Sequence, residues 1–432
     1  MVIYLENIII RLEELIWSEP LVLLLMFTHI YLTFKLNNPQ KYTLKGLKLI
    51  LKNDENKEKK GINSFKSLMT ILAATLGTGN IIGIATAISI GGIGSIFWIF
   101  VTGIFAIATK YAETYIVLKY RKENKTGYYG GTMYVLNDKL KFKLLAVLFS
   151  IFTIIASFGI GSMIQANAMS NSIIETFNIN KYVIAIIVTI ICSYVIFGNE
   201  KRISNISSIL VPIATVIYLF MCVFVLYLYK HNIGAAIINI IEEALNFKAI
   251  SGGIFGSVAI KAMNVGMSKG LFSNEAGMGS SPIFNATVKM KSIKNEAIIS
   301  STSVFIDTVI LCTVTGIAIV SSGMYTITNN PIELVQETFK IIPYGRELLT
   351  FSIAIFAIAT IPCWGYYGKC AVRFLFKENK RYEKIYDFMY AICIYIGSIM
   401  AVNIVWGVSS IANALMIIPN LIMIYKLKND IE

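Results

Sequence analysis

The chain has 432 residues and a formal net charge of +13, and 15% of its residues are charged whereas 56% are hydrophobic. Soluble globular chains carry about 25% charged residues, so this composition, with a mean hydropathy of +0.68, excludes an ordinary soluble domain. The apolar runs are continuous and do not alternate, which excludes a β-barrel. The composition predicts an all-α polytopic membrane protein, because helices satisfy their own backbone hydrogen bonds in lipid.

Residues 1–64 are expected to precede the helical core of the protein. Val2–Ile16 has the pattern of an amphipathic segment, Trp17–Phe34 is apolar enough for an extra transmembrane helix, and Lys35–Lys66 is a basic, cytoplasmic linker. Met1–Ser18 lacks a basic start followed by an apolar run, so no cleavable signal peptide is expected.

Ten further apolar segments bring the expected number of transmembrane helices to eleven, since a helix needs about 20 residues to cross a bilayer. They divide into a five-helix repeat over residues 65–229 and a second over residues 253–427. An extracellular connection, residues 230–252, separates the repeats, and residues 428–432 form a cytoplasmic tail. The ten segments are Phe65–Ile90, Gly94–Lys119, Leu144–Thr176, Tyr182–Phe197, Ile206–Leu228, Gly253–Ser273, Ala297–Ser322, Leu348–Phe376, Ile385–Val402 and Val405–Leu427.

Lysine and arginine predict the orientation, because cytoplasmic loops carry an excess of these residues. With the N-terminus outside, the inner segments hold 28 of them and the outer segments hold 6. The chain is therefore expected in the cell membrane as a multi-pass protein with a cytoplasmic C-terminus. The same split explains the net charge without a nucleic-acid partner. Two connections, Ile233–Leu245 and Ile332–Ile342, are expected to be surface or re-entrant helices.

Two matching helices are expected to be interrupted. Five is an odd number, so the two repeats enter the membrane from opposite sides, as in the inverted repeats of many secondary transporters, where the first helix of each half is often broken. The first helix of one repeat contains Gly77-Thr78-Gly79-Asn80, and the first helix of the other runs into Lys269–Pro282. Both stretches are rich in glycine and polar residues at corresponding positions.

The first stretch has the chemistry of a binding site. Gly77 and Gly79 permit backbone angles that leave peptide groups unpaired, so free N–H groups could bind a carboxylate and free C=O groups could bind sodium. Thr75, Thr78 and Asn80 add neutral oxygens that suit a monovalent cation. The alternative is close packing of helices through small residues, and the second interruption favours binding.

Other polar groups within the apolar segments have two interpretations each. Glu275 is a proton carrier, a gate or a helix cap, and a structural or gating role is favoured. Asp307 is either functional or a partnered structural acid. Lys110 and Glu113 lie three residues apart and are expected to pair.

Four further side chains are candidates for the pocket or for structure. Gln165 could bind both ends of an amino acid, and it could instead join helices, as could its neighbour Asn167. Thr360 and Trp364 share a helix face and could be a sodium ligand and a pocket wall. The sequence holds no catalytic constellation and no Walker motif, so an enzyme is not expected.

Several motifs resemble those of the alanine/glycine:cation symporter family, and the resemblance runs from about Phe65 to Leu427. Its longest match is Gly270–Ser280, and the others are Gly77–Ile81, Tyr111–Glu113, Lys119–Arg121, Gly130–Tyr134, Asp307–Thr308 and Trp364–Gly368. The resemblance implies a LeuT-type fold of two inverted five-helix repeats. It also implies symport of a small neutral amino acid such as alanine or glycine with Na⁺, by a protein that functions as a monomer.

The resemblance also implies site residues. Those assigned to the substrate are Thr75, Gly77, Thr78, Gly79, Gln165, Gly266, Met267 and Trp364. Those assigned to sodium are Ala73, Leu76, Thr360 and Asn80, with Thr75 as a further ligand.

The sequence departs from the family pattern near the expected sodium site. Ala359 stands where the family usually has Ser, which removes one hydroxyl and leaves the cation and its stoichiometry open. Proton coupling through Glu275 or Asp307, and an amino-acid sensor that does not transport, are the alternatives to sodium symport. A channel is disfavoured because polar residues cluster only at the interruptions.

Overall fold

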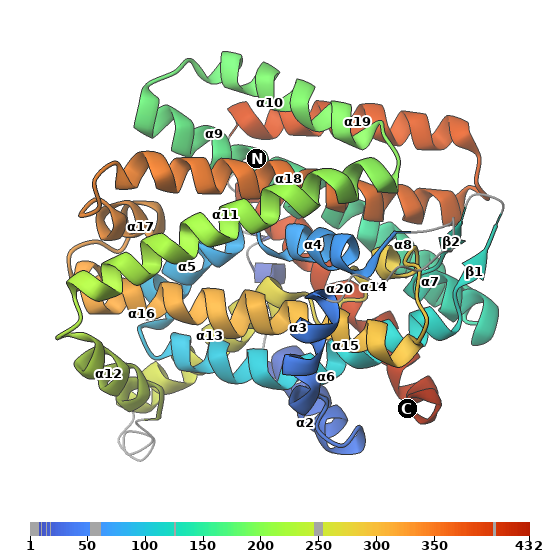
Figure 1. Cartoon of the computed structure of the whole chain (residues 1–432), viewed down its shortest axis with the longest axis horizontal. Coiled ribbons are helices and arrows are strands. Elements are labelled where there is room, and N and C mark those ends of the chain that lie inside the picture. The colour runs from blue at the N-terminus through green and yellow to red at the C-terminus, as the bar shows by residue number, and fades with distance from the viewer. Residues whose placement is uncertain are drawn as a thin grey trace.

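The structure is a computed structural model, and its long helices run mostly along one direction, which is horizontal in Figure 1. Helices α12 (Ile233–Leu245) and α17 (Pro331–Phe339) lie at the left end of this view. The hairpin of β1 (Lys122–Glu123) and β2 (Tyr128–Tyr129) lies at the right end. The structure describes residues 8–9, 11–13, 15–17, 19–51, 62–124, 127–245, 254–400 and 403–432.

The segment before the core is helical over much of its length. Helix α2 (Glu19–Lys35) matches the expected extra span and packs on α6 (Ser95–Lys119). The chain then bends by 68°. Helix α3 (Thr43–Leu51), inside the expected linker, packs on α15 (Ile293–Val304). Most of the expected amphipathic start and residues 52–61 of the linker lie outside the described residues.

The first expected interruption is confirmed. Helix α4 (Ser64–Thr75) ends before Gly77, which is extended (φ −103°, ψ −162°). A short turn, η2 (Thr78–Asn80), leads into α5 (Ile82–Gly91). The chain therefore crosses the expected first span as two half-helices, and we call the segment 76–81 break one.

The second interruption is also confirmed, but it begins later than expected. Helix α13 (Ile254–Asn274) runs unbroken through Lys269–Ser273, the first part of the predicted break. It ends because Glu275, Gly277 and Gly279 have positive φ values of 54°, 88° and 74°, which a right-handed helix cannot contain. We call the segment 275–281 break two, and Pro282 follows it as the first residue of α14.

The other elements follow the expected segments closely. Of the described helices, six are long and apolar enough to cross a membrane, or seven if one bent pair is a single span, so the total of eleven stays a prediction. The connections are helices α12 and α17, as expected. The remaining bounds are β1 (Lys122–Glu123), β2 (Tyr128–Tyr129), α7 (Thr132–Tyr134), α8 (Lys143–Ala156), α9 (Ile164–Phe177), α10 (Lys181–Ile196), α11 (Glu200–Leu228), α12 (Ile233–Leu245), α14 (Pro282–Asn285), α16 (Thr313–Ser322), α17 (Pro331–Phe339), α18 (Gly345–Leu375), α19 (Lys380–Ile399) and α20 (Asn403–Leu427).

Two long helices contain a π-helical stretch that the sequence did not predict. The stretch η4 (Ser157–Met163) joins α8 to α9, and η6 (Phe305–Cys312) joins α15 to α16. Such stretches occur frequently at functional sites. Here η4 packs on α18, and η6 contacts the turn of break one, so both border the centre of the molecule.

Candidate functional site

Asn80 of break one reaches the end of α13, where break two begins. Its Nδ2 donates to Ser273 Oγ at 3.1 Å and also contacts Asp307 Oδ1 from η6. Asp307 Oδ2 accepts hydrogen bonds from Ser273 Oγ at 2.9 Å and Thr308 Oγ1 at 2.8 Å. All four side chains are buried. We call these residues the Asp307 cluster.

One oxygen of the Asp307 cluster is free for a ligand. Among the described residues, buried Asn80 Oδ1 has no hydrogen-bond partner. A buried carboxylate is costly unless it is paired, and the hydrogen-bond partners of Asp307 are neutral amide and hydroxyl groups. An arrangement of carboxylate, amide and hydroxyl oxygens is suited to a hard cation.

Gln165 of α9 contacts the backbone of break one directly. Its Oε1 accepts from both the N–H and the hydroxyl of Thr78 at 3.1 Å, and its Nε2 donates to Ile160 O at 3.3 Å. A β-carbon at Gly77 would lie 2.9 Å from this Oε1, so only glycine leaves room for the contact. Break one therefore offers an N–H group and a hydroxyl group that donate to an acceptor oxygen.

Thr360 of α18 contacts the end of α4. Its hydroxyl lies 2.7 Å from Ala73 O and 2.8 Å from Phe356 O in its own helix. The N–H of Gly77 donates to Thr75 O at 2.9 Å rather than continuing the helix, which releases the carbonyl of Ala73. Ala73 and Thr360, two of the expected sodium ligands, are therefore together, and Leu76 lies at the same helix end.

Other expected pocket residues pack against neighbouring helices. Trp364 is buried against Gly161 of η4, where a β-carbon would lie 2.3 Å from the tryptophan Cβ. Gly266 faces α6, because a β-carbon there would lie 2.4 Å from Ser95 O. Met267 is buried beside it. Asn167 donates to Gly397 O and Met400 O, which is the helix-joining interpretation.

A cavity of about 330 Å³ opens beside break one. Gly79 faces it with room to spare, since the nearest atom to a β-carbon there would be Phe272 Cε1 at 4.0 Å. The first residues of α17 lie along its border. Its lining residues include Thr78, Gly79, Ile82, Ile164, Asn167, Asn171, Lys269, Phe272, Pro331 and Trp406. Sequence reasoning missed Lys269, Phe272 and Trp406, because nothing in the pattern shows which face of a long apolar helix borders a cavity.

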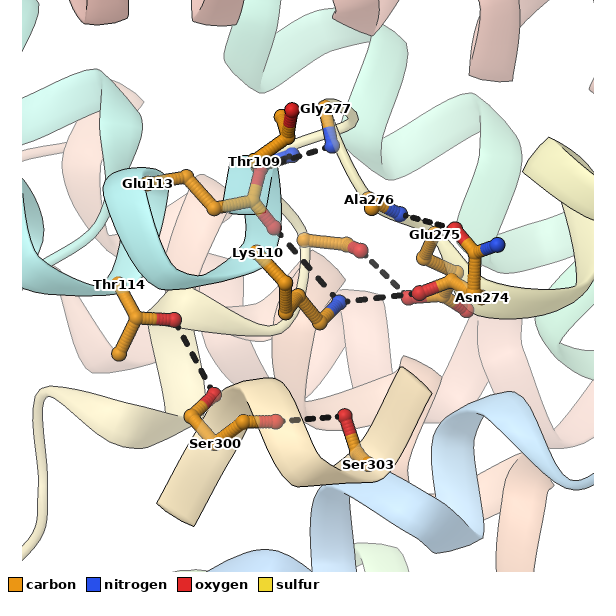
Figure 2. A network of polar contacts seen from close by, with 12 residues as sticks. Thr109, Lys110, Glu113, Thr114, Asn274, Glu275, Ala276, Gly277, Ser300 and Ser303 are labelled. Atoms are coloured by element: carbon orange, nitrogen blue, oxygen red, sulfur yellow. Dashed lines mark hydrogen bonds and ion pairs between the residues drawn. The ribbon is translucent and has the colours of Figure 1, made fainter. Parts of the chain in front are cut away.

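A buried ion pair anchors break two, as Figure 2 shows. Lys110 Nζ lies 3.6 Å from Glu113 Oε1 and donates to Asn274 O at 3.1 Å, which confirms the expected pair. Glu113 Oε2 accepts from the N–H groups of Gly277 at 3.1 Å and Gly279 at 3.2 Å. Both charged side chains are fully buried. The sequence did not reveal that this pair holds the backbone of the break.

Two more contacts complete the loop of break two. Asn420 of α20 also donates to Glu113 Oε2, at 2.8 Å. Glu275 is buried and accepts from Ser280 Oγ at 2.5 Å, so its carboxylate is held by its own loop. Glu275 does not line the cavity beside break one. This geometry suits the structural or gating role more than contact with a substrate.

Comparison with known proteins identifies relatives along the whole chain. The model of the sodium:alanine symporter family matches residues 2–431. An uncharacterized transporter of Haemophilus influenzae is 37% identical over 99% of this chain and 94% of its own length. The sodium/alanine symporter AgcS of Methanococcus maripaludis is 33% identical over 96% and 93%. A probable sodium/glutamine symporter of Bacillus subtilis, GlnT, is 31% identical over 98% and 88%.

A solved structure shows the same fold. The crystal structure of MhsT in complex with L-phenylalanine matches with a TM-score of 0.60 at 14% identity, covering 86% of this chain and 90% of that one. The expected LeuT-type fold is confirmed by this likeness.

Proposed function

Because the chain belongs to the sodium:alanine symporter family, a family of membrane transporters and not of enzymes, we propose that it carries a small neutral amino acid together with Na⁺ by alternating access. The observation that carries the proposal is the Asp307 cluster, where Asn80 of break one contacts Ser273 in the last turn of α13, just before break two, next to a cavity that reaches break one.

The Asp307 cluster is the first place proposed for sodium. Asp307 provides negative charge, and Asn80 provides an oxygen that has no hydrogen-bond partner in the described part of the chain. Ser273 can turn its hydroxyl lone pairs toward a cation. A bound Na⁺ would neutralise the carboxylate in a site that water barely reaches, where an unpaired charge costs several kcal/mol. The residues present therefore fit a monovalent cation.

The carbonyl of Ala73 and the hydroxyl of Thr360 are proposed as a second sodium position, with the backbone of Leu76 close by. Both oxygens are neutral, so a cation here would keep its full charge. Ala359 adds no oxygen beside Thr360. This position is therefore proposed to bind sodium more weakly than the Asp307 cluster. The protein carries two sodium ions per cycle if this position is filled, and one if it is not.

The amino acid is proposed to bind at break one, with its carboxylate at the backbone of Gly77, Thr78 and Gly79. The N–H of Thr78 already donates to an oxygen of Gln165, and a carboxylate oxygen could accept in the same way. Gln165 and Thr75 are proposed to complete the polar part of the site. Met267 and Trp364 are proposed to pack behind the residues that contact the substrate. Gly266 is proposed to contribute by allowing α13 to approach α6 closely.

A small neutral side chain fits both the space and the relatives. The cavity of about 330 Å³ is at the small end of ligand sites. The relatives are named for alanine and glutamine, which both carry neutral side chains. Sodium and substrate would bind cooperatively, because a cation and a carboxylate attract strongly in a site of low dielectric. We propose that a monomer does this, with the two five-helix repeats moving about the breaks.

The test is uptake of radiolabelled L-alanine, glycine and L-glutamine into proteoliposomes with an imposed gradient of either sodium or protons. Accumulation driven by the sodium gradient is expected for at least one of them. Accumulation driven by protons alone would indicate the proton-coupled alternative, for which Glu275 and Asp307 are the acids. Binding without uptake or counterflow would indicate a sensor.

A further inference from the structure

One charged side chain in the cavity has no partner in the mechanism above. Lys269 lies on α13 and lines the cavity together with Gly79 and Thr78. Among the residues that the structure describes, it forms no hydrogen bond and no ion pair. Its ammonium nitrogen instead lies over the ring of Trp406, 6.0 Å from the ring centroid.

An unpaired ammonium in such a place needs a counter-charge. The charge of Glu13 acts on Lys269, but no ion pair joins the two among the residues that the structure describes. A cation against an aromatic face is stabilised less than a cation paired with a carboxylate. The cavity is large enough for a small anion to supply the missing partner.

The position of Lys269 relates it to the cation site. Ser273 of the Asp307 cluster lies four residues further along α13, so the two side chains share one helix face about 6 Å apart along the axis. Phe272 also lies between them in sequence, and its ring packs at a tilt against that of Trp406, with ring centroids 5.9 Å apart. Lys269 thus places a cationic side chain in the cavity wall, whereas Asp307 lies outside the lining and is bonded to Ser273 on the same helix as Lys269.

We propose that Lys269 is a specificity-determining residue that binds the carboxylate of the amino acid in the cavity beside break one. The carboxylate then lies between the ammonium of Lys269 and the sodium at the Asp307 cluster, and the aromatic pair of Phe272 and Trp406 borders the apolar part of the substrate. This inference rests on the proposed function. It adds a charged side chain to a site otherwise built from backbone and neutral groups.

The chemistry favours a carboxylate over the other groups of an amino acid. The substrate ammonium is repelled by Lys269, and its neutral side chain gains little from it, whereas a carboxylate gains a charge-assisted hydrogen bond. Cationic amino acids are disfavoured for the same reason. Asn167 and Asn171 offer amide groups on the same cavity wall, but both are hydrogen-bonded, to α19 and to each other.

The experiment compares K269Q, K269R and K261Q with the wild type. Lys261 is the matched control, because it lies on the same helix and is exposed away from the cavity. Equilibrium binding of labelled L-alanine, glycine and L-glutamine in sodium is measured first, and the KM of sodium-driven uptake second. K269Q should weaken affinity about tenfold, the ratio that corresponds to about 1.4 kcal/mol. K269R should retain most of it, and K261Q should match the wild type.

A second variant keeps the test valid if K269Q does not fold. K269C is treated with 2-aminoethyl methanethiosulfonate, which adds a positive charge, or with methyl methanethiosulfonate, which adds none. Only the charged reagent should restore affinity, and treated wild type provides the blank for the native cysteines. L-Alaninamide has no carboxylate and keeps its positive charge, so it should bind K269Q at least as well as the wild type.

The outcomes separate this inference from the proposed function. Affinity in K269Q within twofold of the wild type, or equal rescue by both reagents, would overturn the role of Lys269. Substrate binding that depends on Lys269 without any sodium-driven uptake would support the inference and contradict the proposed function. A wild type that binds none of the three amino acids would contradict both.

Discussion

Gly77 and Gly79 stand two residues apart in break one, and their surroundings differ. A β-carbon at Gly77 would lie 2.9 Å from Gln165 Oε1, whereas one at Gly79 would enter the cavity and meet Phe272 only at 4.0 Å. Gly79→Ala should therefore fold as the wild type does and bind L-alanine at least tenfold more weakly, because its methyl group takes the space proposed for the carboxylate.

Thermal unfolding in detergent and equilibrium binding of labelled alanine together check this. Gly77→Ala is the companion variant and should lower the melting temperature, since its methyl group displaces Gln165. Full alanine affinity in a folded Gly79→Ala protein would move the substrate away from break one.

Thr360 is the residue that tests the second sodium position. Thr360→Ala removes a hydroxyl that lies 2.7 Å from Ala73 O, and Thr360→Ser retains it. The alanine variant should need several-fold more sodium for half-maximal uptake, whereas the serine variant should not. Thr153→Ala is a matched control, because Thr153 is also a buried threonine that donates one turn back, to Phe149 O at 2.8 Å. An unchanged sodium dependence in Thr360→Ala would leave the Asp307 cluster as the one proposed position.

For single residues, the sequence predicted which polar side chains belong to the site better than it predicted the directions in which side chains point. Asn80, Gln165 and Thr360 were found because oxygens and amides are rare in apolar helices, and the structure gives each a contact at break one or α4. The orientation of Gly266 could not be predicted, because α13 is apolar on several faces and shows no stripe that fixes its rotation. The partnership of Asp307 with Ser273 depends on the same rotation.

Among the elements, break two is held in shape by a side chain from another helix. Glu113 of α6 accepts from two backbone N–H groups of the break and pairs with Lys110. Glu113→Gln should lower the free energy of unfolding by about 3 kcal/mol, because it leaves the buried ammonium without a counter-charge. The melting temperature in detergent should fall, and uptake should fall with it.

Glu337 on α17 provides the control for this substitution. It is more exposed and pairs with Lys340 and Arg346. These partners hold the pKa of its carboxyl below the usual value, and the hydrogen bond from Lys340 is the largest cause. The stability that this pairing contributes is fully present above the ordinary carboxyl pKa. It is lost as the pH falls through the lowered pKa of Glu337. Glu337→Gln should cost less than about 1 kcal/mol at neutral pH, and that cost should vanish in acid. Equal losses in both variants would contradict the anchoring role of Glu113.

The elements themselves were largely predictable from hydropathy, because a segment that crosses lipid must be apolar over its full length. The start of break two was not, since the three left-handed residues that end α13 include Glu275, a residue type that seldom adopts that conformation. The π-helical stretches η4 and η6 were also missed, because one extra residue in a turn leaves the apolar pattern almost unchanged.

For the molecule as a whole, the excess of lysine and arginine predicts that the hairpin end faces the cytoplasm. Two exposed residues at opposite ends test it, Lys340 just after α17 and Lys380 at the start of α19. In intact cells a membrane-impermeant maleimide should label K340C and reach K380C only after permeabilisation. The wild type serves as the blank, and the reverse labelling pattern would invert the proposed orientation.

For the whole molecule, we propose that sodium and an amino acid share one site formed by break one and the last turn of α13. Equilibrium binding to the purified protein tests this most directly, because two ligands coupled in one site must raise each other's affinity by the same factor. Sodium should increase the affinity for L-alanine at least tenfold over a potassium buffer, alanine should increase the affinity for sodium equally, and Asp307→Asn should abolish both effects. An affinity for L-alanine that is the same with and without sodium would contradict a shared site.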